Sequence, residues 1–283
     1  MAKDIHLLIV DPQNDFCDLP DEWLPADPMA GRTERLRPQL AVPGAHEDML
    51  RLSDFIRIHG EKLSDITVTL DSHHHVGIER PAFWVGPGGA DVAPFTPITA
   101  AQVRAGDYLP RDPALLDRVL AYLDALESAG RYTHMVWPAH CEIGSWGHGV
   151  HAAVQAAYNS WESRRAQAVG KILKGQNPLT EHYSAVKAEV PDPDDPDTDV
   201  NRMLLGRLES ADVIVVAGEA GSHCVRATTE HLLEYLDPGR ARQLVLLGDC
   251  ISPVTGFERE YEAFLAAMSA RGVRTVSVCD FDL

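Results

Sequence analysis

Short apolar, β-branched runs recur along the chain, and stretches of helical length separate them. Strands are predicted at Ile5–Val10, Ile66–Leu70, Val213–Val216, Leu244–Leu247 and Val273–Val278, with a weaker run at Val169–Leu173. Helices are predicted at Ala114–Ala129, His148–Ser163, His223–Tyr235 and Glu258–Arg271. Strands that alternate with helices form right-handed crossovers and a parallel sheet that is covered on both faces. The pattern therefore predicts an α/β fold, with three layers (α/β/α) around a central, mostly parallel sheet.

Two stretches interrupt this alternation. Residues 77–112 are rich in Gly and Pro and hold several aromatic residues, which favours a long ordered excursion over a linker. Residues 190–200 form an acidic Pro/Asp loop that we expect to face solvent. Neither stretch requires a domain boundary, so we expect a single domain over residues 1–283 with an insertion at about 77–112.

Composition excludes several classes of partner. The formal net charge is -17, and no cluster of Lys and Arg offers the counter-charge that a phosphate backbone needs, so we expect no nucleic-acid partner. No apolar run approaches the roughly 20 residues that span a bilayer, so we expect no membrane partner. Five widely spaced cysteines without a CxxC pair, and the lack of a recognisable signal peptide, predict free thiols in the cytoplasm.

Polar side chains follow several of the predicted strands. Asp11, Asp71 and Lys174 each come directly after a strand, and Cys224 opens a predicted helix shortly after another. Ligands of an open parallel sheet bind at the carboxyl ends of its strands, so we expect these four side chains at one edge. Taken alone, Asp11 is equally well interpreted as a cap or turn former, and Lys174 as a surface charge. The chain has only five lysines, however, so a lysine is less often found by chance at a strand end beside a glycine, as Lys174 is beside Gly175.

Cys224 is the best candidate for a nucleophile. A helix N-terminus and a nearby lysine both favour the thiolate, and a nearby aspartate can take and return the proton. Gly218 and Gly221 allow a tight turn before Cys224, so that backbone N–H groups can face a developing oxyanion. The alternative for a single cysteine after a strand is a buried, inert thiol.

A second group of residues has the chemistry of a metal site. Asp71 and His73 lie on one side of an extended segment, and His140 can supply a third ligand from another loop. Two imidazoles and one carboxylate suit Zn²⁺, Fe²⁺ or Mn²⁺ and leave open positions for water or substrate. His75 shares the face of His73 and is a competing ligand, and a polar turn without metal is the other interpretation.

Two aromatic residues lie close in sequence to these reactive groups. Phe16 and Trp137 could sandwich a flat substrate, although ordinary core packing explains them equally well.

Five segments together resemble the isochorismatase-like cysteine hydrolases and, within them, the nicotinamidases. The matching stretches are VDPQNDFCD (10–18), TLDSHH (69–74), WPAHCEIGSWG (137–147), LKGQNPLTEHYSAV (173–186) and VVAGEAGSHCVRAT (215–228). Their order along the chain also matches, and they span nearly its whole length.

The resemblance implies a role for each matching position. Asp11, Lys174 and Cys224 correspond to the catalytic triad, and the Glu219–Ala220 bond to a cis peptide that turns the Ala220 N–H toward that of Cys224 as an oxyanion hole. The trio Asp71, His73 and His140 corresponds to ligands of a divalent metal, zinc first and iron or manganese as alternatives. In nicotinamidases this metal holds the pyridine nitrogen of the substrate.

The expected activity is therefore hydrolysis of a small linear carboxamide to a carboxylate and ammonia through a thioester, with nicotinamide as the first candidate substrate. The alternatives are another amide, ureide or carbamoyl compound, or a metal-binding relative without activity. The chain departs from the nicotinamidase pattern at Ser72, where tryptophan is usual, and at His223, a substrate-facing position that is often aromatic. A homo-oligomer is also expected.

Overall fold

The protein is described here by a computed structural model, which covers residues 3–30 and 34–282. Its centre is a six-stranded sheet in the order β10-β9-β8-β1-β2-β7, and all neighbouring strands are parallel. The strands are β1 (Ile5–Val10), β2 (Asp65–Asp71), β7 (Gly170–Lys174), β8 (Val213–Gly218), β9 (Leu244–Leu247) and β10 (Arg274–Val276). The predicted strands and the predicted α/β class are confirmed.

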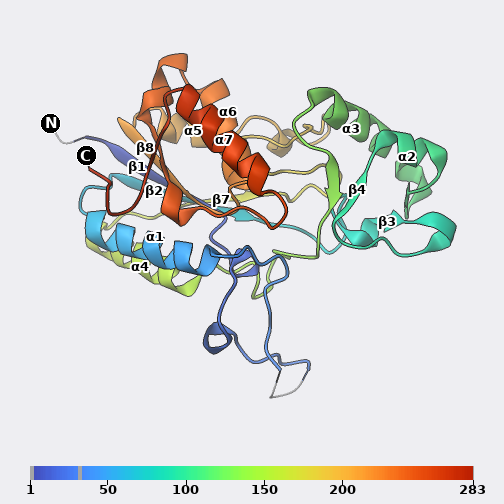
Figure 1. Cartoon of the computed structure of the whole chain (residues 1–283), viewed down its shortest axis with the longest axis horizontal. Coiled ribbons are helices and arrows are strands. Elements are labelled where there is room, and N and C mark those ends of the chain that lie inside the picture. The colour runs from blue at the N-terminus through green and yellow to red at the C-terminus, as the bar shows by residue number, and fades with distance from the viewer. Residues whose placement is uncertain (1–2, 31–33, 283) are drawn as a thin grey trace.

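Helices cover both faces of this sheet (Figure 1). One layer holds α1 (Ala45–His59) and α4 (Ala152–Arg165), which pack against each other. The other layer holds α5 (Arg202–Leu208), α6 (Cys224–Tyr235) and α7 (Glu258–Ala270). Apolar side chains of the sheet and of both layers form the main hydrophobic core. The predicted three-layer arrangement is therefore confirmed.

The excursion after β2 has regular structure of its own. It contains β3 (Trp84–Val85), β4 (Thr96–Ile98), α2 (Ala100–Ala105) and β5 (Leu109–Pro110), and it continues into α3 (Leu116–Ala129) and β6 (His134–Val136). Two short antiparallel ladders, β3–β5 and β4–β6, and a second hydrophobic cluster hold these elements at one end of the molecule (Figure 1). These residues are therefore ordered, and the single domain with an insertion at about 77–112 stays a prediction.

Strand register brings the predicted reactive residues to the carboxyl edge of the sheet. Asp71 on β2 pairs with Lys174 on β7, and Val10, just before Asp11, pairs with Gly218 on β8. Gly218 has a φ of 115°, and a Cβ there would lie 1.9 Å from the carbonyl oxygen of Val10, so only glycine fits. Among the described helices, none combines the length and the apolar character that a membrane crossing requires.

Candidate active site

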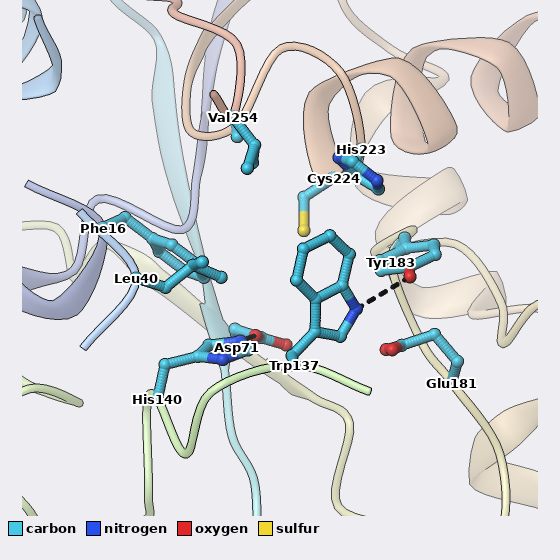
Figure 2. Close-up of a pocket in the computed structure, with 11 residues that line it drawn as sticks. Phe16, Leu40, Asp71, Trp137, His140, Glu181, Tyr183, His223, Cys224 and Val254 are labelled. Atoms are coloured by element: carbon cyan, nitrogen blue, oxygen red, sulfur yellow. Dashed lines mark hydrogen bonds and ion pairs between the residues drawn. The ribbon is translucent and has the colours of Figure 1, made fainter. Parts of the chain in front are cut away.

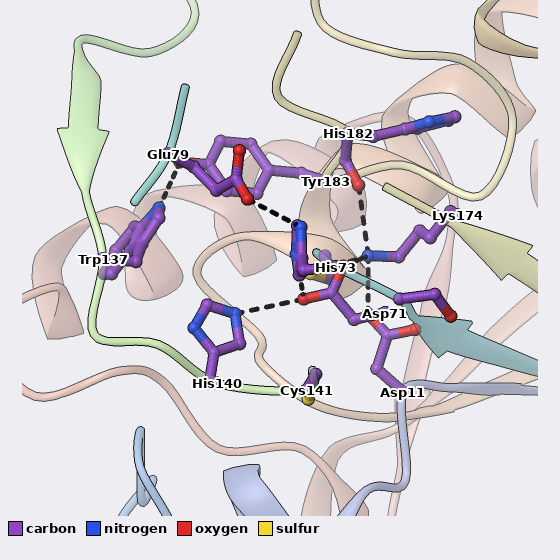
Figure 3. Close-up of polar contacts among 12 residues, drawn as sticks. Asp11, Asp71, His73, Glu79, Trp137, His140, Cys141, Lys174, His182 and Tyr183 are labelled. Carbon is purple, nitrogen blue, oxygen red and sulfur yellow. Dashed lines mark hydrogen bonds and ion pairs between the residues drawn. The ribbon is translucent and has the colours of Figure 1, made fainter. Parts of the chain in front are cut away.

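Lys174 brings the predicted catalytic side chains together. Its Nζ lies 2.9 Å from Asp11 Oδ2 and 3.5 Å from Cys224 Sγ. The same Nζ donates to Asp71 Oδ1 at 2.8 Å and to the carbonyl oxygen of His182 at 3.1 Å. Figure 3 shows the lysine reaching in from β7 between the two aspartates. The three residues predicted as a triad therefore form one contact group, and it extends to the predicted metal trio through Asp71.

The backbone after β1 fixes the orientation of Asp11. This residue has a φ of 44°, in the left-handed region, and its N–H donates to Thr69 Oγ1 at 3.1 Å. The Thr69 hydroxyl in turn donates to Asp11 Oδ1 at 2.5 Å. One carboxylate oxygen is thus held by β2, and the other faces Lys174 and the thiol.

Burial changes the proton equilibria of this group. It raises the pKa of Cys224 well above its ordinary value, although the Lys174 ammonium acts in the opposite direction. Burial also raises the pKa of Asp11, against the charge of Lys174. The pKa of Lys174 is held well above its usual range because the two aspartates outweigh its own desolvation. The resting site is therefore a thiol beside an ammonium and a carboxylate, rather than the preformed thiolate that the helix N-terminus suggests.

The turn before Cys224 leaves two backbone donors free. The Glu219–Ala220 peptide bond is cis, as the resemblance implies. Within the described part of the chain, neither the N–H of Ala220 nor that of Cys224 makes a hydrogen bond, and both residues line the pocket. Free N–H groups beside a nucleophile are the donors that an oxyanion hole requires.

Asp71, His73 and His140 have the geometry of a metal site. The Nε2 atoms of His73 and His140 lie 2.8 Å and 3.1 Å from the same oxygen, Asp71 Oδ2. The three prospective ligand atoms lie within 4.8 Å of one another, and all three residues are buried. These are the three residues that the sequence predicts as ligands.

The outer nitrogens of both imidazoles are held by neighbours that sequence reasoning missed. His73 Nδ1 lies 3.0 Å from Glu79 Oε1, and His140 Nδ1 lies 2.8 Å from the carbonyl oxygen of Pro138. An N–H at Nδ1 would leave the lone pair of Nε2 free for a metal, which is how ligating histidines are usually oriented. At His140 the Nη1 of Arg80 also lies 3.0 Å from Nδ1. Arg80 joins the two sides, because it contacts Glu79 and donates to the carbonyl of His140 at 2.5 Å. The side chains present thus fit a divalent metal.

The two imidazoles differ in charge when no metal is bound. Burial lowers the pKa of His73, but the Asp71 carboxylate outweighs it and the pKa rises to about 9. Burial and the Arg80 guanidinium lower the pKa of His140 to about 4. Metal binding at neutral pH therefore has to displace a proton from His73.

His75 does not compete for this site. Its side chain is 71% exposed, and its Nδ1 faces Glu142 at 3.3 Å. The sequence left His75 open because alternate residues of an extended segment share a face. That argument fails here because β2 ends at Asp71 and the chain turns beyond His73.

The N-terminal motif supports the site through two side chains that sequence reasoning did not single out. The Gln13 amide donates to the carbonyl of Asp71 at 2.8 Å and accepts from the N–H of Asp71 at 2.7 Å. Asp15 accepts from the N–H of Cys141 at 2.6 Å and so fixes the loop that carries His140. The signal is their placement directly after Asp11 in the stretch DPQNDF.

An aromatic pocket joins Cys224 to the prospective metal ligands (Figure 2). The three residues predicted to contact substrate, Phe16, Trp137 and His223, all line it. The lining residues that were not predicted as substrate contacts are Leu40, Glu181, Tyr183 and Val254. Trp137 Nε1 donates to the hydroxyl of Tyr183 at 2.9 Å, which fixes the indole as one wall.

Glu181 is a polar group of the pocket that no pattern in the sequence indicated. It is buried, and its Oε2 has no hydrogen-bond partner among the described residues. Burial, helped by the charge of Glu79, raises the pKa of Glu181 to about 7. A titratable carboxyl group therefore lines the same pocket as Cys224.

Comparison with known proteins gives matches among solved structures. No protein-family model and no curated protein matches the sequence. A nicotinamidase/pyrazinamidase of Acinetobacter baumannii is 19% identical, with 98% of both chains covered and a TM-score of 0.63. A pyrazinamidase of Pyrococcus horikoshii in complex with zinc is 18% identical; the match covers 97% of this chain and 99% of that chain, with a TM-score of 0.53. An isochorismatase family protein of Desulfovibrio vulgaris is 16% identical; the match covers 98% of this chain and 95% of that chain, with a TM-score of 0.51.

The chain has the isochorismatase-like fold. The matches cover nearly the whole of this chain and of the similar chains. The chemistry has to be argued from the side chains themselves, since one fold hosts many reactions.

Proposed function

We propose that the chain is a cysteine amidohydrolase that converts a small aromatic carboxamide, nicotinamide first, to its carboxylate and ammonia. The observation that carries the proposal is the contact of one buried ammonium, Lys174, with Asp11, Cys224 and Asp71. This arrangement couples a nucleophile and its base to a prospective metal site within one pocket. Buried titratable groups with shifted pKa values in a cleft are the usual mark of a catalytic site.

The mechanism follows from the proton equilibria. As Sγ of Cys224 attacks the substrate carbonyl carbon, its proton passes to Asp11, and the Lys174 charge stabilises the developing thiolate. The N–H groups of Ala220 and Cys224 donate to the tetrahedral oxyanion. Asp11 then returns the proton to the leaving nitrogen, the C–N bond breaks, and ammonia departs. Water, deprotonated by Asp11, attacks the thioester, and the carboxylate leaves as the thiol is restored.

The trio Asp71, His73 and His140 would hold one divalent metal, zinc first, with iron or manganese as alternatives. A metal bound there supplies a Lewis-acidic position beside the pocket that can accept a ring nitrogen and orient the substrate. Glu79 and the carbonyl of Pro138 lie beside the outer nitrogens of the two imidazoles, where they can accept the N–H that such binding requires. Three protein ligands leave room for substrate, as in sites that serve reactions rather than folding.

The shape of the pocket supports a flat heteroaromatic amide as the substrate. Phe16 and Trp137 line a narrow pocket that has Cys224 at one end and Asp71 and His140 at another. A pyridine ring with a carboxamide meta to its nitrogen would present the carbonyl carbon to Cys224 and the ring nitrogen to the prospective metal. The similar structures from Acinetobacter baumannii and Pyrococcus horikoshii bear names of enzymes that act on such amides.

The direct test is ammonia release from a panel of amides by the zinc-reconstituted protein. We expect kcat/KM to be highest for nicotinamide and pyrazinamide and at least about tenfold lower for benzamide, which lacks the ring nitrogen. A preference for ureido or carbamoyl compounds would move the assignment to the broader amide hydrolases. Turnover of none of them would favour a metal-binding relative without activity. The cytoplasmic location and the homo-oligomeric state stay predictions.

A further inference from the structure

The loop after β9 is hydrogen-bonded to the turn that carries the proposed oxyanion hole. The N–H of Gly221 donates to the carbonyl of Ser252 at 2.8 Å, and the N–H of Ser252 donates to Glu219 Oε2 at 3.2 Å. A Cβ on Gly221 would lie 2.5 Å from the ring of Tyr261, so turn and loop are in close contact. The amide of Ala220 therefore lies between two residues that are both anchored to Ser252.

Glu219 is a buried carboxyl group with one oxygen unaccounted for. The residue is 0% exposed, and its Oε1 has no hydrogen-bond partner among the described residues. Ser252 donates to its Oε2 and also to the carboxyl group of Asp48, which is buried too and comes from the first turn of α1. Two ionised carboxylates cannot share such a site without strong repulsion.

The donors around Asp48 identify which carboxyl group is ionised. Asp48 Oδ1 receives Arg51 Nη2 at 2.5 Å, and Asp48 Oδ2 receives the hydroxyl of Ser252 at 2.5 Å. Glu219 receives only the N–H of Ser252, on Oε2. A proton on Glu219 Oε1 would supply the missing partner and complete the set of hydrogen bonds.

We propose that Glu219 carries a proton that it donates to Asp48, and that this hydrogen bond makes Glu219 a positioning residue for the Ala220 amide. The inference rests on the proposed function, since it assigns the Ala220 N–H to the oxyanion. The shared proton ties α1 to the turn before Cys224, and Ser252 closes the link from the other side. The turn is thereby held by side chains that never touch the substrate.

The surroundings of the pair agree with a retained proton. Burial raises the pKa of Glu219 well above its ordinary value, and the charge of Asp48 raises it further. The titratable and charged groups that face the pair are Arg51 on α1, Cys17 and Asp18 from the loop after β1, Cys250 from the segment after β9, and Tyr261 on α7. Arg51 is the cation in this set, and it contacts Asp48 rather than Glu219.

Two substitutions at Glu219 distinguish the role of a hydrogen-bond donor from that of side-chain volume. Glu219→Gln places an NH₂ where the proposed O–H lies and keeps the acceptor for Ser252, whereas Glu219→Leu removes both. We expect Glu219→Gln to keep kcat within about twofold of wild type, and Glu219→Leu to lower kcat at least about tenfold with little change in KM, since a lost oxyanion donor costs 10²–10³ elsewhere. A folded Leu variant with kcat within about twofold of wild type would overturn the positioning role.

A second measurement does not depend on activity. A carboxyl group whose folded pKa is raised stabilises the fold at low pH, and this contribution is lost as pH rises from the unfolded toward the folded pKa. The ratio of folded to unfolded protein should therefore rise in Glu219→Gln relative to wild type, by up to about tenfold per pH unit above pH 5. Glu47→Gln, an exposed neighbour of Asp48, should show no such trend.

The two measurements also separate the two proposals. A pH-independent ratio between Glu219→Gln and wild type would overturn the shared proton, even if the Leu variant fails to fold. Wild-type protein that hydrolyses no amide would overturn the proposed function and the positioning role together. The pH dependence of unfolding in Glu219→Gln and wild type would still decide where the proton lies.

Discussion

Lys174 shows how far one residue can organise a site. Its side chain is 1% exposed and is surrounded by two carboxylates, a thiol and a carbonyl oxygen. A buried ammonium is stable only when such partners offset its desolvation. The sequence predicted Lys174 because lysine is rare in this chain and follows a strand. It could not reveal that Asp71 is shared between the lysine and the two imidazoles, because that contact depends on the register of β2 with β7.

Replacing this lysine should change the acidity of the nucleophile. In Lys174→Met the positive charge that opposes the burial effect is gone, so the pKa of Cys224 should rise further and kcat/KM should fall by about 10²–10⁴. The pH dependence of the alkylation rate of Cys224 reports this pKa. Lys171→Met is the matched control, because Lys171 lies on the same strand but points outward over Tyr158. An alkylation profile identical to wild type would show that Lys174 is not the partner of the thiol.

At the scale of elements, hydrophobic periodicity predicted the central strands and the helices α3, α4, α6 and α7. It missed α1, although its buried residues Ala45, Met49, Leu52 and Ile56 recur at helical spacing. It also missed the short strands of the excursion, because two- and three-residue ladders have no periodicity to detect. Glu79 was missed for the same reason, because it lies in the excursion and approaches His73 only in the folded structure.

The start of the excursion should therefore tune the metal site. Glu79→Gln keeps an acceptor for His73 Nδ1 but removes the charge, so zinc affinity should fall by about 10–100-fold. A competition titration with a chromophoric chelator measures the change. Glu142→Gln removes a half-exposed carboxylate near His75 and should leave affinity unchanged. Equal affinity of wild type and Glu79→Gln would remove Glu79 from the support of the site.

The pKa of His73 predicts how metal binding depends on pH. His73 holds a proton below about pH 9 in the absence of metal, and a ligating imidazole must lose it. Zinc affinity should thus rise by up to about tenfold per pH unit between pH 6 and 8, and zinc binding should release close to one proton. Calorimetry in buffers of different ionisation enthalpy counts this proton. Binding without proton release would place the metal elsewhere or leave His73 out of the ligand set.

At the scale of the whole molecule, we expect the fold to form without the prospective metal. Hydrogen bonds from Gln13, Asp15 and Arg80 already hold the ligand-bearing loops in place, and the main hydrophobic core reaches the pocket through residues such as Phe16 and Trp137. Fold class was predictable from the sequence because it follows from alternating strands and helices. The pocket was only partly predictable, because Glu181, Tyr183 and Val254 reach it from loops that carry no periodic signal.

Removal of metal should consequently stop turnover of nicotinamide and leave the fold intact. We expect chelated protein in metal-free buffer to melt within a few degrees of wild type. Zinc added back should raise the melting temperature only as ligand linkage requires, by an amount set by its concentration relative to its Kd. Differential scanning calorimetry across a zinc titration distinguishes this case. Loss of the cooperative transition on chelation would make the site structural.

The central claim is that Cys224 forms a covalent intermediate during amide hydrolysis. Its most direct test is ammonia release from nicotinamide by wild type, Cys224→Ala and Cys279→Ala, with circular dichroism to confirm that each is folded. Cys279 is exposed and serves as the control for loss of a thiol. The account predicts that Cys279→Ala keeps wild-type turnover and that Cys224→Ala falls to background. A folded Cys224→Ala protein with activity within tenfold of wild type would contradict it.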